Sequence, residues 1–375
     1  MSKKHQILLL NYEFPPLGGG AGNATYYLLK ELTKHPELQI TLVTSSVDQY
    51  HEEQFSDNIK IYYLDIGKNG NIHYQSNKNI LTYCWKAYKF CQKLKENNHF
   101  DLVHAWFGIP SGYIAMKLNI PYIVGLRGSD VPFYNNRFFW LDRLVFKNLS
   151  KTIWKNADLV IANSKGLKEL ANKSVPEQII GVIYNGVDIE EFYPDHQKHP
   201  KFTIVSTSRL IQRKGIEYLI AGFARFAEQK DDVQLHVIGS GDLETKFQKM
   251  VQEMAIEKKV NFFGPVAHDE INKLYRHSDV FVLPSLNEGM SNSLLEAMAS
   301  GLAVLATDTG GTKELVDDSN GIIIEKNSTE SIYLALQKLY NNRQMLIDMK
   351  GQSRGKAEGL SWGKMAGEYI EIYNK

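Results

Sequence analysis

The sequence predicts an α/β protein built from two doubly wound domains, and three observations support this prediction. Short apolar runs bounded by turn residues alternate with longer amphipathic segments, which is typical of buried parallel strands with helices between them. The pattern restarts after the polar, proline-bearing segment 193–201. The chain of 375 residues, 43% hydrophobic and 23% charged, is also longer than one ordinary core supports.

The predicted strands fall into two groups. In the first half of the chain they are 6–12, 39–46, 59–66, 101–107, 122–126, 158–162 and 179–184. In the second half they are 202–206, 234–238, 261–263, 280–283, 303–306 and 321–324. We therefore predict an N-terminal domain over 1–193 and a second domain over 202–357. Ligands of such sheets bind beyond the carboxyl ends of the strands, so we expect a site in the cleft between the domains.

The composition argues against several classes of protein. The 43 basic and 42 acidic residues nearly cancel, so no global field favours nucleic acid and we expect no nucleic-acid partner. We interpret Cys84 and Cys91 as reduced, buried thiols of a reducing compartment. The first apolar run, 7–10, fits neither a signal peptide nor a membrane span, and we expect a cytoplasmic protein.

The strongest functional signal lies between Glu288 and Glu296, two carboxylates separated by seven residues. They follow the apolar run 279–284 and open the helix-forming stretch 294–300, which predicts a strand, a tight loop and a helix start. Gly289 allows the backbone to approach a ligand closely. The N–H groups expected to point outward at the positive end of the helix dipole belong to Met290, Ser291, Asn292 and Ser293. We expect these groups to bind an anion.

If the anion is a sugar diphosphate, one glutamate accepts hydrogen bonds from the sugar and the other from a ribose. Three alternatives stay open. Ser293 and Glu296 also match a capping box, and Glu288 also fits a solvated loop residue. The two glutamates also match the acid and nucleophile of a glycosidase, which their spacing in the sequence does not exclude.

Two cations follow the first strand of the second predicted domain. Arg209 and Lys214 lie in its strand-to-helix loop, at the same sheet edge as the helix start after Glu288. Arginine offers a bidentate fork to phosphate oxygens, and lysine offers a compact charge. Together they fit a departing diphosphate, although an isolated loop of this kind is more often simply solvated.

Glycines follow two further strand ends. Gly18, Gly19 and Gly20 lie in the loop after the first strand, and Gly239 follows a strand of the second domain. Glycine allows a phosphate or sugar to approach the backbone, but neither the dinucleotide fingerprint nor a Walker lysine is present. A plain turn explains these glycines as well.

His104 and Arg127 lie at successive strand ends of the first predicted domain. This placement suggests that His104 orients the acceptor or binds the transferred sugar, and that Arg127 contacts sugar or phosphate. A core histidine and a surface ion pair are the more common explanations of such residues. No Asp-x-Asp pair and no His/Cys cluster with ligand spacing occurs, so we expect neither a bound metal nor a resident cofactor.

Taken in order, these residues resemble the retaining glycosyltransferases of family four. That family has the GT-B architecture of two doubly wound, Rossmann-like domains facing a central cleft, and its Glu-x7-Glu signature matches Glu288 to Glu296. Further matches are Gly18-Gly19-Gly20, Asn163-Ser164, Asn185-Gly-Val-Asp188, Arg209, Lys214-Gly215 and Gly310-Gly311.

The resemblance implies a role for each matching residue. Arg209 and Lys214 would bind the donor diphosphate, Glu296 the ribose, and Glu288 with nearby backbone the sugar. The first-domain glycines would face the phosphates and the acceptor. A C-terminal helix within 361–375 would cross back to the first, acceptor-side domain.

Two positions depart from the family pattern. Trp106 stands where many relatives carry a second histidine, and Arg127 stands at the histidine of a His-Gly-x-Asp motif. We therefore expect the contacts on the acceptor side to differ from those of such relatives.

These residues predict transfer of a hexose from a nucleotide diphosphate sugar to a carbohydrate or lipid-linked acceptor, in cell-surface polysaccharide or glycolipid synthesis. The resemblance implies retention at the anomeric carbon. The alternatives are a sugar-nucleotide epimerase, a phosphorylase, which would need pyridoxal phosphate, or a non-catalytic sugar-nucleotide-binding protein. Aromatic and basic residues in 85–90 and 133–147 suggest peripheral contact with the inner membrane face, and core packing is the more common explanation.

Overall fold

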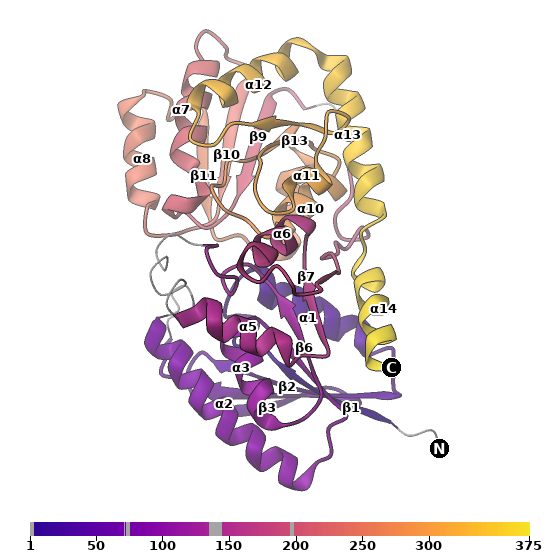
Figure 1. The fold of residues 1–375 in the computed structure, drawn as a ribbon. Helices are drawn as coiled ribbons and strands as arrows, with labels where there is room; N and C mark the ends of the chain where they lie inside the picture. Colours follow the sequence, from indigo (N-terminus) through magenta and orange to yellow (C-terminus); the bar gives the residue numbers. More distant parts are fainter. Residues whose placement is uncertain (1–3, 71, 73–75, 135–144, 196–198) are drawn as a thin grey trace. The chain divides into compact units, whose positions relative to one another are not determined.

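The computed structural model describes residues 4–70, 72, 76–134, 145–195 and 199–375. The chain forms two compact units, of which unit 1 comprises Met1–Asn185 with Trp362–Lys375 and unit 2 comprises Gly186–Ser361. Each unit is an open, mainly parallel sheet covered by helices (Figure 1). The predicted fold class of two doubly wound α/β domains is therefore confirmed.

The described strands of unit 1 form one sheet in the order β3-β4-β2-β1-β5-β6-β7-β8. Their bounds are β1 His5–Leu10, β2 Leu38–Ser46, β3 His51–Ser56, β4 Ile59–Asp65, β5 Leu102–Trp106, β6 Tyr122–Leu126, β7 Leu159–Ala162 and β8 Gly181–Val182. Each predicted run of the first half coincides with one of them. The edge strand β3, which pairs antiparallel with β4, was not predicted, because the exposed residues 51–54 lack an apolar pattern.

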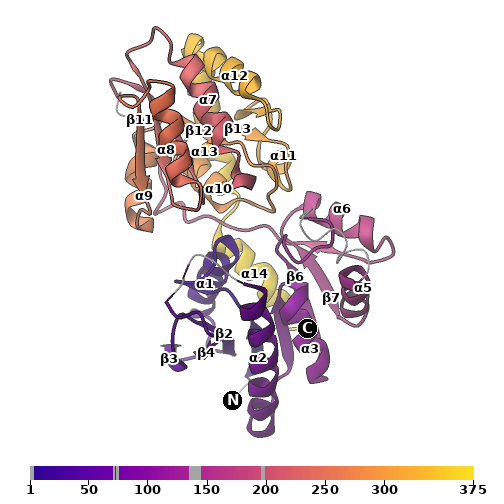
Figure 2. The same cartoon turned by 90° about the vertical axis from the view of Figure 1, so that its left-hand side faces the viewer.

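The strand order of unit 1 reverses at β1, which pairs with β2 on one side and β5 on the other. Right-handed crossovers therefore place α1 on one face of the sheet and α2 and α3 on the other (Figures 1 and 2). The helices are α1 Gly20–Leu32, α2 Asn77–Asn97, α3 Tyr113–Leu118, α5 Lys147–Lys155, α6 Lys165–Ser174 and α14 Trp362–Tyr373. The last helix packs on the first, with the Trp362 and Tyr27 rings stacked 4.8 Å apart.

Unit 2 has a parallel sheet in the order β11-β10-β9-β12-β13-β14. The strands are β9 Phe202–Thr207, β10 Val233–Ile238, β11 Val260–Gly264, β12 Val280–Leu283, β13 Ala303–Thr307 and β14 Gly321–Ile324. The helices are α7 Ile216–Phe226, α8 Glu244–Glu253, α9 His268–Arg276, α10 Asn292–Ala299, α11 Thr312–Leu315, α12 Thr329–Asn341 and α13 Arg343–Glu358. The order reverses between β9 and β12, and the carboxyl ends at such a reversal are where open α/β sheets bind ligands.

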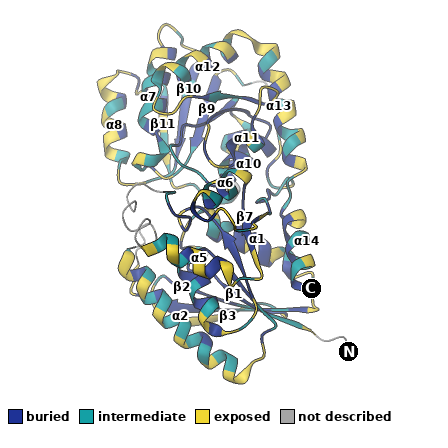
Figure 3. Ribbon diagram, in the orientation of Figure 1, coloured by how far each residue is buried: buried dark blue, intermediate teal, exposed yellow. Residues whose placement is uncertain are grey.

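Each unit has its own hydrophobic core around its central strands. Residues of β1, β9 and β12 are buried on both faces of the sheets. Helices such as α8 show a buried and an exposed side (Figure 3). Cys91 is buried and Cys84 half-buried, and both are free thiols. Among the described residues, none of the helices has the length and apolar character needed to cross a bilayer. Of the predicted aromatic and basic surface, residues 135–144 lie outside the described residues.

Candidate functional site

Glu288 lies in the loop between β12 and α10, at the carboxyl edge of the unit 2 sheet. Its Oε1 accepts hydrogen bonds from Lys214 Nζ and from Ser285 Oγ, the latter at 2.7 Å. The Lys214 and Glu288 side chains are only 13% and 12% exposed. Burial by itself would raise the pKa of Glu288, but the charge of Lys214 and the hydrogen bonds to it and Ser285 hold the pKa below its ordinary value. The pair is thus a nearly buried ion pair.

A glycine brings Lys214 to this position. The short 3-10 helix Gln212–Lys214 ends at Gly215, whose φ is 64°, and a Cβ there would lie 2.3 Å from the carbonyl oxygen of Pro284. The loop after β9 therefore lies directly against the end of β12. Both the backbone conformation of Gly215 and this contact exclude a side chain. The geometry therefore explains why a glycine follows Lys214.

The Gly310-Gly311 pair supports Glu288 from the other side. Gly310 has a φ of 49°, and a Cβ there would lie 2.1 Å from the Glu288 carbonyl oxygen. Gly311 N donates a hydrogen bond to the Gly289 carbonyl oxygen at 2.8 Å. The loop after β13 thus fixes the backbone of Glu288 and Gly289.

Gly239 has a comparable role after β10. Its φ is 118°, and a Cβ would lie 2.0 Å from the Ser208 carbonyl oxygen. The next backbone contact joins Leu210 N to the Ser240 carbonyl oxygen at 2.8 Å. Arg209, between these contacts, is exposed. The group that approaches Gly239 closely is thus another loop of the protein. A contact of Gly239 with the donor stays a prediction.

The start of α10 corrects one alternative from the sequence. The N-cap is Ser291, whose Oγ accepts a hydrogen bond from Leu294 N at 3.3 Å. A capping box from Ser293 to Glu296 is therefore wrong, because Ser293 lies inside the helix. Glu296 is not used as a capping residue, whereas Met290, Ser291 and Asn292 are nearly buried at the helix N-terminus.

Glu296 instead contacts His268, a residue that the sequence did not single out. His268 Nδ1 lies 2.7 Å from Glu191 Oε1, and its Nε2 lies 3.4 Å from Glu296 Oε1. Burial would lower the pKa of His268, but the two carboxylates outweigh burial and raise it to about 9. His268 is therefore a cation at neutral pH and donates an N–H to each carboxylate. Local spacing gave no signal, because Glu191 and Glu296 are 77 and 28 residues away from it.

In unit 1, His104 is completely buried on β5. Its Nδ1 lies 2.6 Å from the hydroxyl oxygen of Tyr373 on α14. Burial, together with the charge of Arg127, lowers the pKa of His104 well below its ordinary value, so the ring is neutral. This geometry favours the core-histidine alternative, and a contact with acceptor or sugar stays a prediction.

The two departures from the family pattern contact each other. The Arg127 guanidinium lies 3.4 Å from the centre of the Trp106 ring. Its two terminal nitrogens donate to Asn185 Oδ1 at 3.1 Å and to the Tyr369 hydroxyl at 2.9 Å. Arg127 is buried, so it is not part of a surface ion pair. It instead ties β5 and β6 to the C-terminal helix α14.

The glycine loop after β1 approaches a carboxylate of the protein itself. Gly18 has a φ of 93°, and a Cβ there would lie 2.6 Å from Glu13 Cβ. Gly19 N donates to Glu13 Oε2 at 3.4 Å, and α1 starts at Gly20 without a side-chain cap. An N–H at this helix start therefore already serves an anionic group. A contact of these glycines with donor phosphates stays a prediction.

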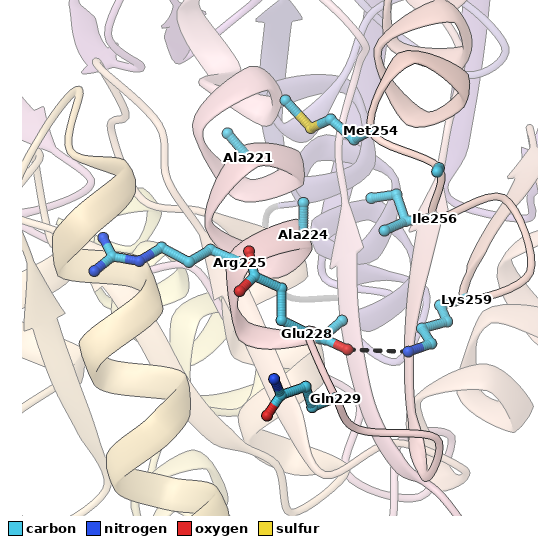
Figure 4. Close-up of a pocket in the computed structure, with 10 residues that line it drawn as sticks. Ala221, Ala224, Arg225, Glu228, Gln229, Met254, Ile256 and Lys259 are labelled. Carbon is cyan, nitrogen blue, oxygen red and sulfur yellow. Dashed lines mark hydrogen bonds between the residues drawn. The ribbon is translucent and has the colours of Figure 1, made fainter.

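Two other features of unit 2 lie away from this site. A pocket of about 490 Å³ between α7 and the segment after α8 is lined by Arg225, Met254 and Lys259 among others, near the amino end of β11 (Figure 4). Asp195, His199 and His277 have potential ligand atoms within 4.8 Å of one another, a group that sequence spacing did not reveal. The prediction that no metal is bound stays a prediction.

Two family models match the chain. The model described as Glycosyltransferase Family 4 matches residues 18–191, and the model described as Glycosyl transferases group 1 matches residues 188–356. An uncharacterized glycosyltransferase of Methanocaldococcus jannaschii is 25% identical over 99% of this chain and 98% of its own length. The Campylobacter jejuni N-acetylgalactosamine-N,N'-diacetylbacillosaminyl-diphospho-undecaprenol 4-alpha-N-acetylgalactosaminyltransferase is 27% identical over 74% of each chain.

Solved structures share the fold over the whole chain. Sucrose-phosphate synthase from Thermosynechococcus elongatus has a TM-score of 0.86 at 20% identity, covering 99% of this chain and 98% of its own. Anabaena HepE in complex with UDP has a TM-score of 0.74 at 17% identity, covering 99% of both chains. Together with the two family models, these findings show that the chain is a glycosyltransferase of family 4 with the GT-B fold.

Proposed function

We propose that this glycosyltransferase moves a hexose from a nucleoside diphosphate sugar to an acceptor hydroxyl, with retention at the anomeric carbon and without a bound metal. The observation that carries the proposal is the Lys214–Glu288 ion pair beside the N-terminus of α10, where the strand order of unit 2 reverses. Such a reversal, a cation and the positive end of a helix dipole together suit a diphosphate.

In the proposed reaction, the bond between the anomeric carbon and the donor phosphate oxygen breaks. The acceptor oxygen forms a new bond to that carbon on the same face, and its proton passes to a donor phosphate oxygen. In the transition state, negative charge develops on the donor phosphate before the acceptor proton neutralises it. Lys214, Arg209 and the N–H groups at the start of α10 stabilise that charge, a contribution of about 3–4 kcal/mol for one well-placed donor.

The glutamates recognise the donor in this proposal and do not exchange protons. Glu288 accepts hydrogen bonds from hydroxyls of the sugar, supported by the backbone of Gly289, and Glu296 accepts them from the ribose. The low pKa of Glu288 suits this role, because an ionised carboxylate only accepts. An acid catalyst would need the opposite shift.

The relatives favour a particular class of substrates. HepE has been crystallised with UDP and with UDP-glucose, and the Campylobacter enzyme is named for a diphospho-undecaprenol acceptor. We therefore propose a nucleotide-sugar donor, a lipid-linked or carbohydrate acceptor, and a role in glycolipid or polysaccharide synthesis. Peripheral contact with the inner membrane face is part of the proposal, supported by the exposed Leu81 and Trp85 on α2.

The test is a screen of nucleoside diphosphate sugars for release of the nucleoside diphosphate, with EDTA present. We expect release that depends on an added acceptor, and NMR of the product should show the same anomeric configuration as the donor. Conversion of the donor without an acceptor would instead identify an epimerase. Activity lost in EDTA and restored by one divalent metal would contradict metal independence.

A further inference from the structure

A pocket of about 910 Å³ opens at the carboxyl edge of the unit 1 sheet. Its walls come from the loop after β1, the loop after β2, and one side of the β3–β4 hairpin. This is the edge at which an open α/β sheet binds ligands. The Lys214–Glu288 ion pair and the start of α10, which carry the donor assignment, belong to unit 2. We therefore consider a different ligand for this pocket.

The edge strand β3 presents one of its faces to this pocket. His51 and Glu53, two residues apart, both contact Tyr63 of β4. The His51 and Tyr63 rings stack at 4.2 Å, and Glu53 Oε2 accepts a hydrogen bond from the Tyr63 hydroxyl at 2.7 Å. Glu52 points to the opposite face and pairs with Lys60. His51 and Glu53 nevertheless stay exposed, so their outer sides are available to a ligand.

The chemistry of the walls is that of a sugar site. Asp48 and Glu53 offer carboxylate oxygens that accept hydrogen bonds from hydroxyl groups, and His51 offers exposed ring surface to the C–H face of a sugar.

The charge of the walls restricts the ligand further. Of the described residues that line the pocket, none is a lysine or an arginine, whereas two are carboxylates. A phosphate in this pocket would meet like charges without compensation. The diphosphate of a lipid-linked acceptor therefore has to lie outside it.

We propose that this pocket is the acceptor subsite and that it takes an uncharged, terminal sugar ring of the acceptor. The proposal rests on the proposed function, because it presumes that unit 1 provides the acceptor. It adds that the enzyme attaches the hexose to an uncharged sugar of the acceptor, and not directly to a phosphorylated headgroup.

The experiment measures ligand binding by saturation-transfer difference NMR. The probes are methyl α-glucopyranoside and methyl N-acetyl-α-glucosaminide, both uncharged, and glucose 6-phosphate as an anionic counterpart. The variants are His51→Ala and Glu53→Gln in the pocket, with Glu52→Gln as the matched control. Glu52→Gln removes the same charge from the same exposed strand, but on its other face. Thermal unfolding checks that all variants fold.

We expect the wild type and Glu52→Gln to bind at least one uncharged glycoside equally well, and neither to bind glucose 6-phosphate. His51→Ala should weaken glycoside binding roughly two- to tenfold, as for the loss of one aromatic contact, and Glu53→Gln should also weaken it. The proposal would be overturned if no glycoside bound, or if glucose 6-phosphate bound as tightly as the glycosides. Equal effects of Glu52→Gln and Glu53→Gln on glycoside binding would also overturn it.

A second measurement separates this proposal from the proposed function. Binding of UDP, GDP and ADP should be the same in the wild type and in the β3 variants. Lys214→Met should weaken the binding of whichever nucleotide binds. If Lys214→Met has no effect on it, the donor assignment fails, whatever the glycoside result. If only the glycoside result fails, the acceptor subsite is wrong and the donor assignment stands.

Discussion

Lys214 and Glu288, which lie in loops 74 residues apart, form a direct and nearly buried ion pair. The resemblance to family four implies different donor contacts for the two residues, the diphosphate for Lys214 and the sugar for Glu288. Their contact means that Lys214 keeps Glu288 ionised, and that each side chain holds the other in place before a donor binds. Both assignments are compatible with this pair, since the link between diphosphate and sugar is a single bond.

Removal of the lysine charge should therefore slow transfer. We expect Lys214→Met to lower kcat/KM about 10²- to 10³-fold, as for other losses of a preorganised transition-state contact. The matched control is Lys313→Met, which removes a more exposed lysine paired with Asp308 in the same unit. Steady-state kinetics with the identified donor provides the measurement, and equal rates for Lys214→Met and the control would rule out the assignment.

His268 should make stability depend on pH. Its folded pKa of about 9 lies above the ordinary 6.5, so the stabilisation is fully present below pH 6.5 and is lost as the pH rises through 9. We expect the Tm of the wild type to fall between these pH values more steeply than that of His268→Gln. His35→Gln, which changes an exposed histidine of unit 1, should follow the wild type. Parallel curves for His268→Gln and the wild type would contradict the bridged geometry.

Gly215 should tolerate no side chain. Gly215→Ala forces a Cβ to 2.3 Å from a backbone oxygen at a positive φ. The same holds for Gly310→Ala, and each should cost about 1–3 kcal/mol or more in the free energy of unfolding. Gly351→Ala is the matched control, because this helical glycine has open space around it and alanine should stabilise the helix by about 1 kcal/mol. Urea unfolding measures all three.

Arg127 should be needed for docking of the C-terminal helix. Arg127→Lys keeps the charge but loses the planar stack on Trp106 and one of the two hydrogen bonds to Asn185 and Tyr369. We expect faster hydrogen exchange in α14 and a decrease of about 1–3 kcal/mol in the free energy of unfolding. Glu371→Gln, an exposed change on α14, serves as the control. Unchanged exchange in Arg127→Lys would show that α14 docks without this contact.

The exposed side of α2 should contribute to binding of anionic membranes. Leu81 is 70% and Trp85 56% exposed, and Lys89 lies 4.4 Å above the Trp85 ring. We expect Leu81→Ser with Trp85→Ser to reduce flotation with vesicles that contain phosphatidylglycerol, because the change removes apolar surface that can enter the interface. The control is Leu334→Ser on α12, at 54% exposure. Absence of flotation in the wild type would refute peripheral binding by this helix.

The sequence by itself determined the two sheets, because a buried parallel strand has to be apolar along its whole length and is recognisable as a short run. It also indicated the loops at the carboxyl ends, with Glu288, Lys214 and Gly310, since residue order places each loop after its strand. The exposed edge strand β3 was missed for the same reason, because its residues carry no apolar pattern.

Only the tertiary structure decided which of these groups meet. It paired Lys214 with Glu288, placed Arg127 against Trp106, and brought His268 between Glu191 and Glu296. It also removed His104 from solvent and made Ser291, not Ser293, the cap of α10. These contacts join residues far apart in the chain, and their partners follow from strand order and loop packing, on which local spacing carries no information.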